Sequence, residues 1–376
     1  MVHGQTGTTN IELNGNEKRV LELVRRGKGI SRSALVMQTS LNQSSVHRIV
    51  EHLAEQGYLN IGESVPNGRG KPSPAVMLNP AAVYGFGISV NSDSVTASLV
   101  NFCGEVVNSE VLDIIPQDPS RTLIDIKYHY LNILKKHGIP PDKVSGIGYS
   151  MAGFMYTDRR YFNPPEPLKN WLGIDLGREI HTLFDKPVWV ENNGSTGAYA
   201  EAFLGAGLRY KTFGYLSFNY GFGGGVVIDG KLFSGAFGNA GEISRIYSPQ
   251  ETSKRPALGL LIDRLNRGGI EIHNIRELRD NFDPNWPIAQ EWVDEVTPYL
   301  DRAIDAFKAV IDPEAIVFGG EIPLKLGKMF MDKRRPKVDE RWNIPAQQPE
   351  LMLSAIQGDS ASIGAALTPV RDIYFS

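Results

Sequence analysis

The stretch PVWVENNGSTGAYAEAFL, residues 187–204, decides the fold class of this chain. Its first residues are apolar and β-branched or aromatic, as in a short buried strand, and a helix is expected from about Ser195 to Leu204. The polar residues Asn192 and Asn193 lie between the two, where the chain turns from strand to helix. A strand that leads directly into a helix predicts an α/β body.

The segments on either side repeat this mixture of strands and helices. Further strands are expected over residues 84–89, 94–100, 105–115, 144–149, 213–218 and 225–228, with a long helix over residues 120–137. Short turns at residues 91–93 and 102–104 separate the first three strands.

Three glycine-rich runs are candidate ligand-binding loops. Residues 219–225, NYGFGGG, join two predicted strands, and successive glycines can expose backbone N–H groups to an anion. The run lacks the lysine and Ser/Thr of a P-loop, so a tight hairpin remains the alternative. Residues 318–321 and 358–366 can either line a cleft or allow close packing of helices on a sheet.

The first 60 residues predict a helix-turn-helix. Three helices are expected, over residues 16–26, from Ser31 and from Asn42 to about residue 56, with a very short link before the third. The third helix has an apolar stripe on one side and short polar groups on the other. A recognition helix presents such groups to base edges in the major groove. The predicted DNA-binding residues here are Ser31, Asn42, Gln43, Ser44, Ser45, His47 and Arg48.

A wing follows these helices. Residues 58–63 and 75–78 read as two strands, and PNGRGKP at residues 66–72 forms the tip of the hairpin between them. Arg69 and Lys71 add positive charge there, which suits contact with phosphates or a narrow minor groove. A plain surface turn is the alternative for the tip alone, but together with the three helices it predicts binding to double-stranded DNA.

Composition narrows the function classes further. Residues 1–80 carry a net charge of +3 and the remaining residues a net charge of −6, so a basic head precedes an acidic body. The single cysteine, Cys103, excludes a disulfide framework and a Cys-rich zinc module. We find neither a signal peptide nor an apolar run of about 18 residues, and therefore expect a cytoplasmic protein without membrane contact.

The order of these segments resembles the ROK family, which covers repressors and sugar kinases. Five segments carry the resemblance: residues 85–107, 187–207, 213–242, 312–321 and 358–366. The resemblance implies a winged helix-turn-helix domain over residues 1–80 and a two-lobed, actin-like, sugar-kinase-like effector domain over residues 81–376. The small lobe is expected over about residues 82–192 plus the C-terminal helix, and the large lobe over about residues 193–355.

The chain departs from the kinase pattern of the family at three places. Ser89 and the run Asn-Ser-Asp at residues 91–93 replace the Asp-x-Gly-Gly-Thr phosphate loop. Asn193 replaces the catalytic aspartate, and an amide cannot accept a proton at neutral pH. Tyr220 replaces a threonine of the second phosphate loop. We therefore expect no enzyme activity and no cofactor.

The zinc site of the family is also expected to be absent, because Arg245 stands in place of its histidine and no cysteine follows Cys103. Arg245 suggests an acidic ligand, and a salt bridge to Glu242 is the alternative. The resemblance places the sugar-binding residues at Asn163, Glu166, Asn192, Asn193 and Glu242; for the two consecutive asparagines a capped turn is the alternative.

Together these observations predict a sugar-responsive repressor that binds a carbohydrate-like effector and acts as a homodimer or tetramer. The alternatives are a sugar kinase with an accessory DNA-binding head, a regulator controlled by a protein partner, and a regulator without any ligand.

Overall fold

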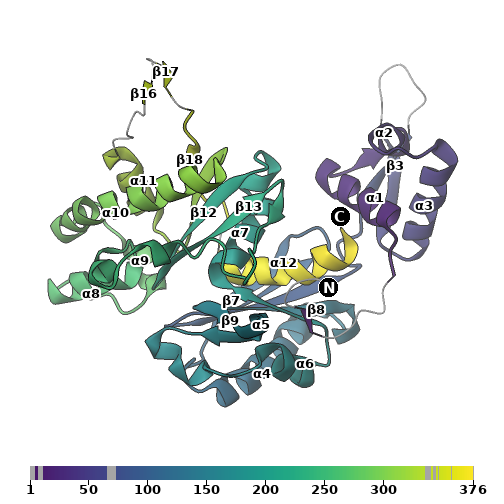
Figure 1. Ribbon diagram of the computed structural model, residues 1–376. Coiled ribbons are helices and arrows are strands. Elements are labelled where there is room, and N and C mark those ends of the chain that lie inside the picture. The colour runs from purple at the N-terminus through teal and green to yellow at the C-terminus, as the bar shows by residue number, and fades with distance from the viewer. Residues whose placement is uncertain are drawn as a thin grey trace.

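The computed structural model describes residues 5–6, 12–65, 73–334, 340–341, 344–345, 347–356 and 358–375. Figure 1 shows a small head made of the first helices and a larger body that contains two separate sheets. None of the helices described combines the length and the apolar character that crossing a membrane requires.

The head is a winged helix-turn-helix. Its helices are α1 (Gly15–Gly27), α2 (Arg32–Gln38) and α3 (Gln43–Glu55), and its sheet has the order β2 (Ile30–Ser31), β4 (Ser73–Leu78), β3 (Leu59–Val65). Each helix starts at a capping side chain, as the predicted caps Ser31 and Asn42 do for α2 and α3. The predicted tip with Arg69 and Lys71 lies outside the described residues.

The first lobe of the body, as we call it, is built on a six-stranded sheet. Its order is β1 (Gln5–Thr6), β11 (Val188–Asn192), β8 (Val144–Met151), β5 (Tyr84–Val90), β6 (Val95–Asn101), β7 (Val106–Leu112). Strands β11, β8 and β5 are parallel, and the three predicted strands β5 to β7 pair antiparallel in the order of the chain.

Two helices and a small hairpin complete the first lobe. Residues of α4 (Pro119–His137) and α6 (Leu176–Phe184) share a hydrophobic core with this sheet. The hairpin of β9 (Phe154–Tyr156) and β10 (Tyr161–Asn163) encloses the one-turn helix α5 (Thr157–Arg160) and leads into the 3₁₀ helix η2 (Glu166–Trp171).

The second lobe is built on a five-stranded sheet. Its order is β14 (Lys231–Leu232), β13 (Phe222–Ile228), β12 (Phe213–Phe218), β15 (Ala315–Gly320), β18 (Glu350–Leu353). Its helices are α8 (Leu258–Arg267), α9 (Ile275–Asn281), α10 (Pro287–Ile311) and α11 (Leu324–Lys333). The short segments η4 (Ile243–Ile246) and η5 (Pro249–Lys254) lie between β14 and α8.

Two helices lie between the sheets, α7 (Asn193–Leu204) and α12 (Ser360–Tyr374), the latter yellow in Figure 1. Helix α12 packs on β5 and β8, α7 packs on β12 and β13, and the two helices contact one another. The contacts are close enough to require glycine: a Cβ on Gly364 would lie 1.8 Å from the Thr196 carbonyl oxygen, and one on Gly194 2.2 Å from that of Gly224.

This packing corrects the interpretation of residues 219–225 as one turn. Strand β13 already begins at Phe222 and pairs with β12 along its length, so the turn is confined to residues 219–221. A Cβ on Gly225 would lie 2.7 Å from the Gly194 carbonyl oxygen of α7, and one on Gly224 would lie 2.5 Å from the Tyr215 carbonyl oxygen of β12. Close packing therefore accounts for these glycines.

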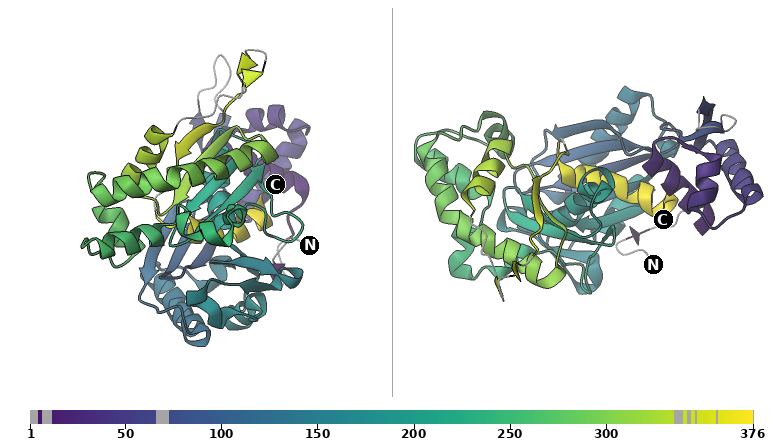
Figure 2. Two further views of the ribbon diagram at one scale, coloured as in Figure 1. Left: turned by 60° about the vertical axis from the view of Figure 1, so that its left-hand side comes forward. Right: turned by 90° about the horizontal axis from the view of Figure 1, so that it is seen from above.

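The head lies against the body (Figure 2), and the two share a hydrophobic core. Tyr58 of the head lies 5.8 Å from Phe102 and 5.4 Å from Tyr374, measured between ring centroids. Arg25 of α1 lies over the ring of Phe203, 3.9 Å from its centroid, and donates a hydrogen bond to the Phe203 carbonyl oxygen. Head and body are thus packed together through the ends of α7 and α12.

Candidate functional site

The main candidate site is a cavity of about 540 Å³ between the two lobes, within the usual size range of small-molecule sites. The first lobe contributes the ends of β5, β8 and β11 with the β9–β10 hairpin, and the second lobe contributes the β12–β13 turn, η4 and the start of α8. Of the predicted effector residues, the cavity is lined by Asn163, Asn192, Asn193, Glu242 and Arg245.

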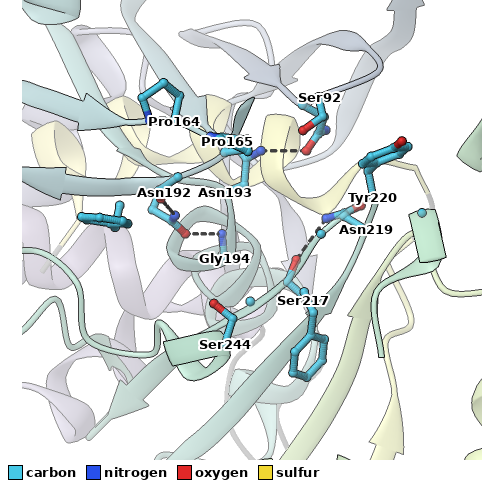
Figure 3. Close-up of a pocket in the computed structure, with 18 of the residues that line it drawn as sticks. Ser92, Pro164, Pro165, Asn192, Asn193, Gly194, Ser217, Asn219, Tyr220 and Ser244 are labelled. Atoms are coloured by element: carbon cyan, nitrogen blue, oxygen red, sulfur yellow. Dashed lines mark hydrogen bonds between the residues drawn. The ribbon is translucent and has the colours of Figure 1, made fainter. Parts of the chain in front are cut away.

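Asn192 holds the strand-to-helix turn in place. Its Oδ1 accepts hydrogen bonds from the backbone N–H groups of Gly194 and Ser195, and its Nδ2 donates to the carbonyl oxygen of Gly153. The helix α7 consequently starts at Asn193, two residues before the predicted position. The capped turn considered above is therefore present, and it fixes the residue that follows at the cavity wall (Figure 3).

Asn193 has one end of its side-chain amide hydrogen-bonded and the other end without a partner among the described residues. Its Nδ2 donates to Asn91 Oδ1 at 2.8 Å and to the Val90 carbonyl oxygen at 3.2 Å. Its Oδ1 is buried and has no hydrogen-bond partner among the described residues. A buried carbonyl oxygen without a partner is costly, so a ligand hydroxyl that donates to it would be stabilised.

Glu242 and Arg245 come from one turn of η4 but do not form an ion pair. Burial raises the pKa of the Glu242 carboxyl to about 7, and the charge of Arg245 opposes that rise. No nitrogen of Arg245 lies within 4.0 Å of a carboxylate oxygen of any described residue. The guanidinium lies instead 5.2 Å from the ring centroid of Phe154, across the cavity on the first lobe.

The lining does not include Glu166. Its carboxylate lies on the surface and pairs with Lys169 at 2.8 Å, so the structure does not bring it together with the other predicted residues. The cavity is also lined by polar residues that are not among the predicted effector residues: Ser92, Ser217, Asn219, Ser244, Arg255 and Asp263. Two of them belong to the loops at residues 91–93 and 219–225 discussed above, and the fold brings all of them together from separate segments.

A second hollow adjoins this cavity at the turn between β5 and β6, where Asn91 lines both, and it collects acidic groups. Asp93, Glu321 and Asp359 line it, and burial raises the pKa of all three carboxyls. Arg279 pairs with Glu321. In a sugar kinase of the resembled family the nucleotide phosphates need positive or neutral neighbours, and three buried carboxylates do not fit such a group.

The zinc of the resembled family fits no better. Arg245 occupies the place of the histidine ligand, and no described group of three or more His, Cys, Asp or Glu side chains is arranged to hold a metal ion. Zinc sites require thiolate, imidazole or carboxylate ligands, which this part of the cavity wall does not offer in sufficient number.

The outer face of α3 is the candidate DNA interface. Gln43, Ser44, His47 and Arg48 are exposed there, and Ser45 is partly exposed. Asn42 Oδ1 accepts from the Ser45 backbone N–H and the Ser44 hydroxyl, and Ser31 Oγ accepts from the Ala34 N–H, so both caps also fix the helix ends. Arg32 pairs with Glu51 and also lies 3.2 Å from His47 Nδ1, so it fastens α2 to α3 beside a residue of this face.

Comparison with known proteins identifies both parts of the chain. Residues 86–254 match the ROK family and residues 11–70 match the MarR family. A xylose repressor of Caldicellulosiruptor bescii is 24% identical over 367 residues, covering 87% of this chain and 88% of the repressor. One of Bacillus subtilis is 30% identical over 235 residues, covering 61% of this chain and 60% of that repressor.

A solved structure shares the complete architecture. The crystal structure of a ROK family transcriptional regulator, described as a homolog of the E. coli MLC protein, superimposes with a TM-score of 0.70 at 20% identity. The match covers 96% of each chain. The likeness supports the fold, a winged helix ahead of an actin-like, two-lobed body.

Proposed function

Because this chain carries a ROK-family domain behind a MarR-like winged helix, we propose that it is a sugar-responsive transcriptional repressor. The observation that carries the proposal is the position of α7. Its first residue lines the cavity between the lobes, and its last turn contacts the DNA-binding head through Phe203 and Arg25. One helix thus reaches from the wall of the effector cavity to helix α1 of the DNA-binding head.

On the DNA side, α3 enters the major groove of an operator. Gln43, His47 and Arg48 read base edges, while the wing with Arg69 and Lys71 contacts the backbone or minor groove. Two heads bind the two half-sites of a palindrome, which requires a homodimer or a dimer of dimers. Such a regulator acts in the cytoplasm, where the chromosome is accessible.

On the effector side, a carbohydrate-like molecule occupies the cavity. Asn163, Asn192, Asn193 and Glu242 supply the donors and acceptors that vicinal hydroxyl groups require. The unpartnered Oδ1 of Asn193 is the acceptor with most to gain, because a sugar hydroxyl would supply the missing hydrogen bond.

The signal travels along α7. Its 12 residues span about 18 Å at 1.5 Å per residue, from the cavity wall to the contact with α1. An effector that draws the lobes together shifts α7 against β13 and α12, and the head moves with its far end. Control of this kind requires the effector to favour one arrangement by about 1–3 kcal/mol.

The protein does not phosphorylate its effector. Asn193 offers no general base, and Asp93, Glu321 and Asp359 repel nucleotide phosphates from the adjoining hollow. Loss of a positioned base alone typically reduces the rate by about 10²–10⁴-fold.

The test uses the complete protein, a labelled operator and a panel of sugars. Operator fragments are selected from genomic DNA by the protein itself, and affinity is then measured by fluorescence anisotropy. We expect at least one sugar to weaken operator binding, with no ADP released from ATP in a coupled assay. Sugar-dependent ADP release would establish a kinase instead, and unchanged operator affinity with every sugar would remove the effector from the proposal.

A further inference from the structure

Two arginines of the second lobe line the interlobe cavity. Arg245 belongs to η4, and Arg255 lies between η5 and the start of α8. The two residues are ten positions apart in the chain, and the fold brings both to the same cavity. Only the first was expected there from the sequence.

Neither arginine has an anionic partner. Within the part of the chain that the structure describes, no carboxylate oxygen lies within 4.0 Å of Arg245 or Arg255. Three nearby arginines, Arg264, Arg279 and Arg302, each pair with a glutamate. The two arginines at the cavity differ from these three, whose charges are balanced by ion pairs.

Arg255 is the more buried of the two arginines and lacks a hydrogen-bond partner at one nitrogen among the described residues. The nitrogen without a partner is Nε, which is itself buried. Burial lowers the pKa of its guanidinium. Arg245 is exposed toward the cavity and rests over Phe154, so its guanidinium edge is free to bind a ligand.

The acidic groups of the cavity only partly balance these charges. Glu242, whose pKa is close to neutral, is divided between its charged and uncharged forms at pH 7. Asp263 of α8 lines the cavity with an exposed side chain, so water screens its charge. A guanidinium forms two parallel hydrogen bonds with a carboxylate or a phosphate, and these bonds are stronger than those to neutral acceptors.

We propose that the effector is a carbohydrate carrying one anionic group, a carboxylate or a phosphate ester, and that Arg245 and Arg255 bind this group. The inference rests on the proposed function and specifies its ligand class. The amide-rich wall around Asn192 and Asn193 binds the sugar hydroxyls, and the arginine wall on the second lobe binds the anion. A ligand that contacts both walls also holds the lobes together.

Calorimetric titration of the complete protein with matched ligands tests this inference. The neutral members are glucose, galactose and xylose; the carboxylates are glucuronate, galacturonate and xylonate; the phosphates are glucose 6-phosphate, galactose 6-phosphate and xylose 5-phosphate. Inorganic phosphate and acetate serve as anions without a sugar. We expect at least one acid or phosphate to bind ten times more tightly than its neutral counterpart and than either free anion.

Substitution of each arginine tests whether it causes the tighter binding of the anionic ligand. Arg255→Met and Arg245→Met should each weaken the anionic ligand by at least tenfold and its neutral counterpart by less than threefold. Lys254→Met removes the same charge one residue away, from a side chain that does not line the cavity, and should change neither affinity. Arg245 is exposed, so its variant is informative even if Arg255→Met does not fold.

The outcomes separate this inference from the function on which it rests. Equal affinity for neutral and anionic partners, or an equal loss for both in the variants, overturns the anionic class and leaves sugar control intact. Equally tight binding of free phosphate or acetate overturns the carbohydrate part. If no carbohydrate binds and none alters operator affinity, the sugar-responsive function fails together with the inference.

Discussion

Asn193 places an amide where the kinases that this chain resembles have a carboxylate. The amide is integrated into the structure, since its Nδ2 donates to two oxygens, Asn91 Oδ1 and the Val90 carbonyl. An aspartate there would bring a negative charge against both acceptors and leave Asn91 Oδ1 without this donor, whereas the Val90 carbonyl oxygen would still accept from the Ala152 N–H. The neighbours of Asn193 thus fit an amide better than a carboxylate.

We predict that Asn193→Asp lowers the free energy of unfolding at pH 8 by about 1–3 kcal/mol, the cost of leaving buried polar groups unpaired. Urea denaturation measures this difference. Asn219→Asp, on a partly exposed side chain of the same cavity, is the matched control and should change stability by less than about 0.5 kcal/mol. Equal stability of Asn193→Asp and the parent protein would contradict the hydrogen-bond arrangement described.

Glu191 of β11 lines a different hollow from the effector cavity, and its carboxyl makes the free energy of unfolding depend on pH. Burial raises the pKa of its carboxyl to about 7; Arg159 opposes the rise, Asp372 adds to it, and Lys231 and Arg371 line the same hollow. The unfolded carboxyl titrates near pH 4.5, so the folded state binds the extra proton between these values. Stability should therefore fall as the pH rises from about 4.5 to 7.

Glu191→Gln should lose less stability than the parent protein between pH 5 and pH 8, by up to about 3 kcal/mol from this one group. Thermal unfolding at a series of pH values measures the slope. The exposed Glu55→Gln should leave that slope unchanged. A parallel pH dependence in Glu191→Gln and the parent would show that the carboxyl is ionised in the folded protein.

Among the elements, α7 and α12 depend on glycine at their contact. Gly364→Ala would place a Cβ 1.8 Å from the Thr196 carbonyl oxygen and force the helices apart. We predict that it lowers the free energy of unfolding by about 3 kcal/mol. Gly221→Ala, where no atom lies within 4 Å of the added carbon, is the control. Scanning calorimetry measures the unfolding midpoint temperature of both variants. Equal midpoints would contradict this prediction.

Local signals predicted most of the elements. The caps Ser31 and Asn42, the apolar stripe of α3 and the three strands β5 to β7 depend on neighbours within a few residues, so the sequence is enough to predict them. The predicted start of β13 is three residues late, because a run of glycines resembles a turn when the contact of Gly224 and Gly225 with α7 is unknown. Arg255 was missed for a related reason: only the fold brings it to the cavity.

On the scale of the whole molecule, the contact between Arg25 and Phe203 is one of those through which the body meets the head. We predict that Arg25→Met leaves sugar affinity unchanged and operator affinity without sugar within about threefold. The loss of operator affinity caused by sugar should shrink, from the 1–3 kcal/mol typical of such coupling to less than about 0.5 kcal/mol. Anisotropy titrations with and without the sugar measure both quantities.

Arg26→Met is the control for this coupling. Its guanidinium is mostly exposed and pairs with Glu22 of the same helix, so it removes the same charge from the same turn without touching the body. Full sugar response in Arg25→Met, or an equal loss in both variants, would place the route between effector and operator elsewhere in the molecule.

The core shared by head and body also limits how such regulators can be recombined. A DNA-binding domain attached by a flexible linker can be replaced by another one. The chimera then binds a new operator and still responds to the original effector. Here the exchange would remove Tyr58 from its contacts with Phe102 and Tyr374 and expose apolar surface on both sides. A working chimera of this protein must carry the matching aromatic residues of both partners across the junction, so operator specificity and signal response are inherited together.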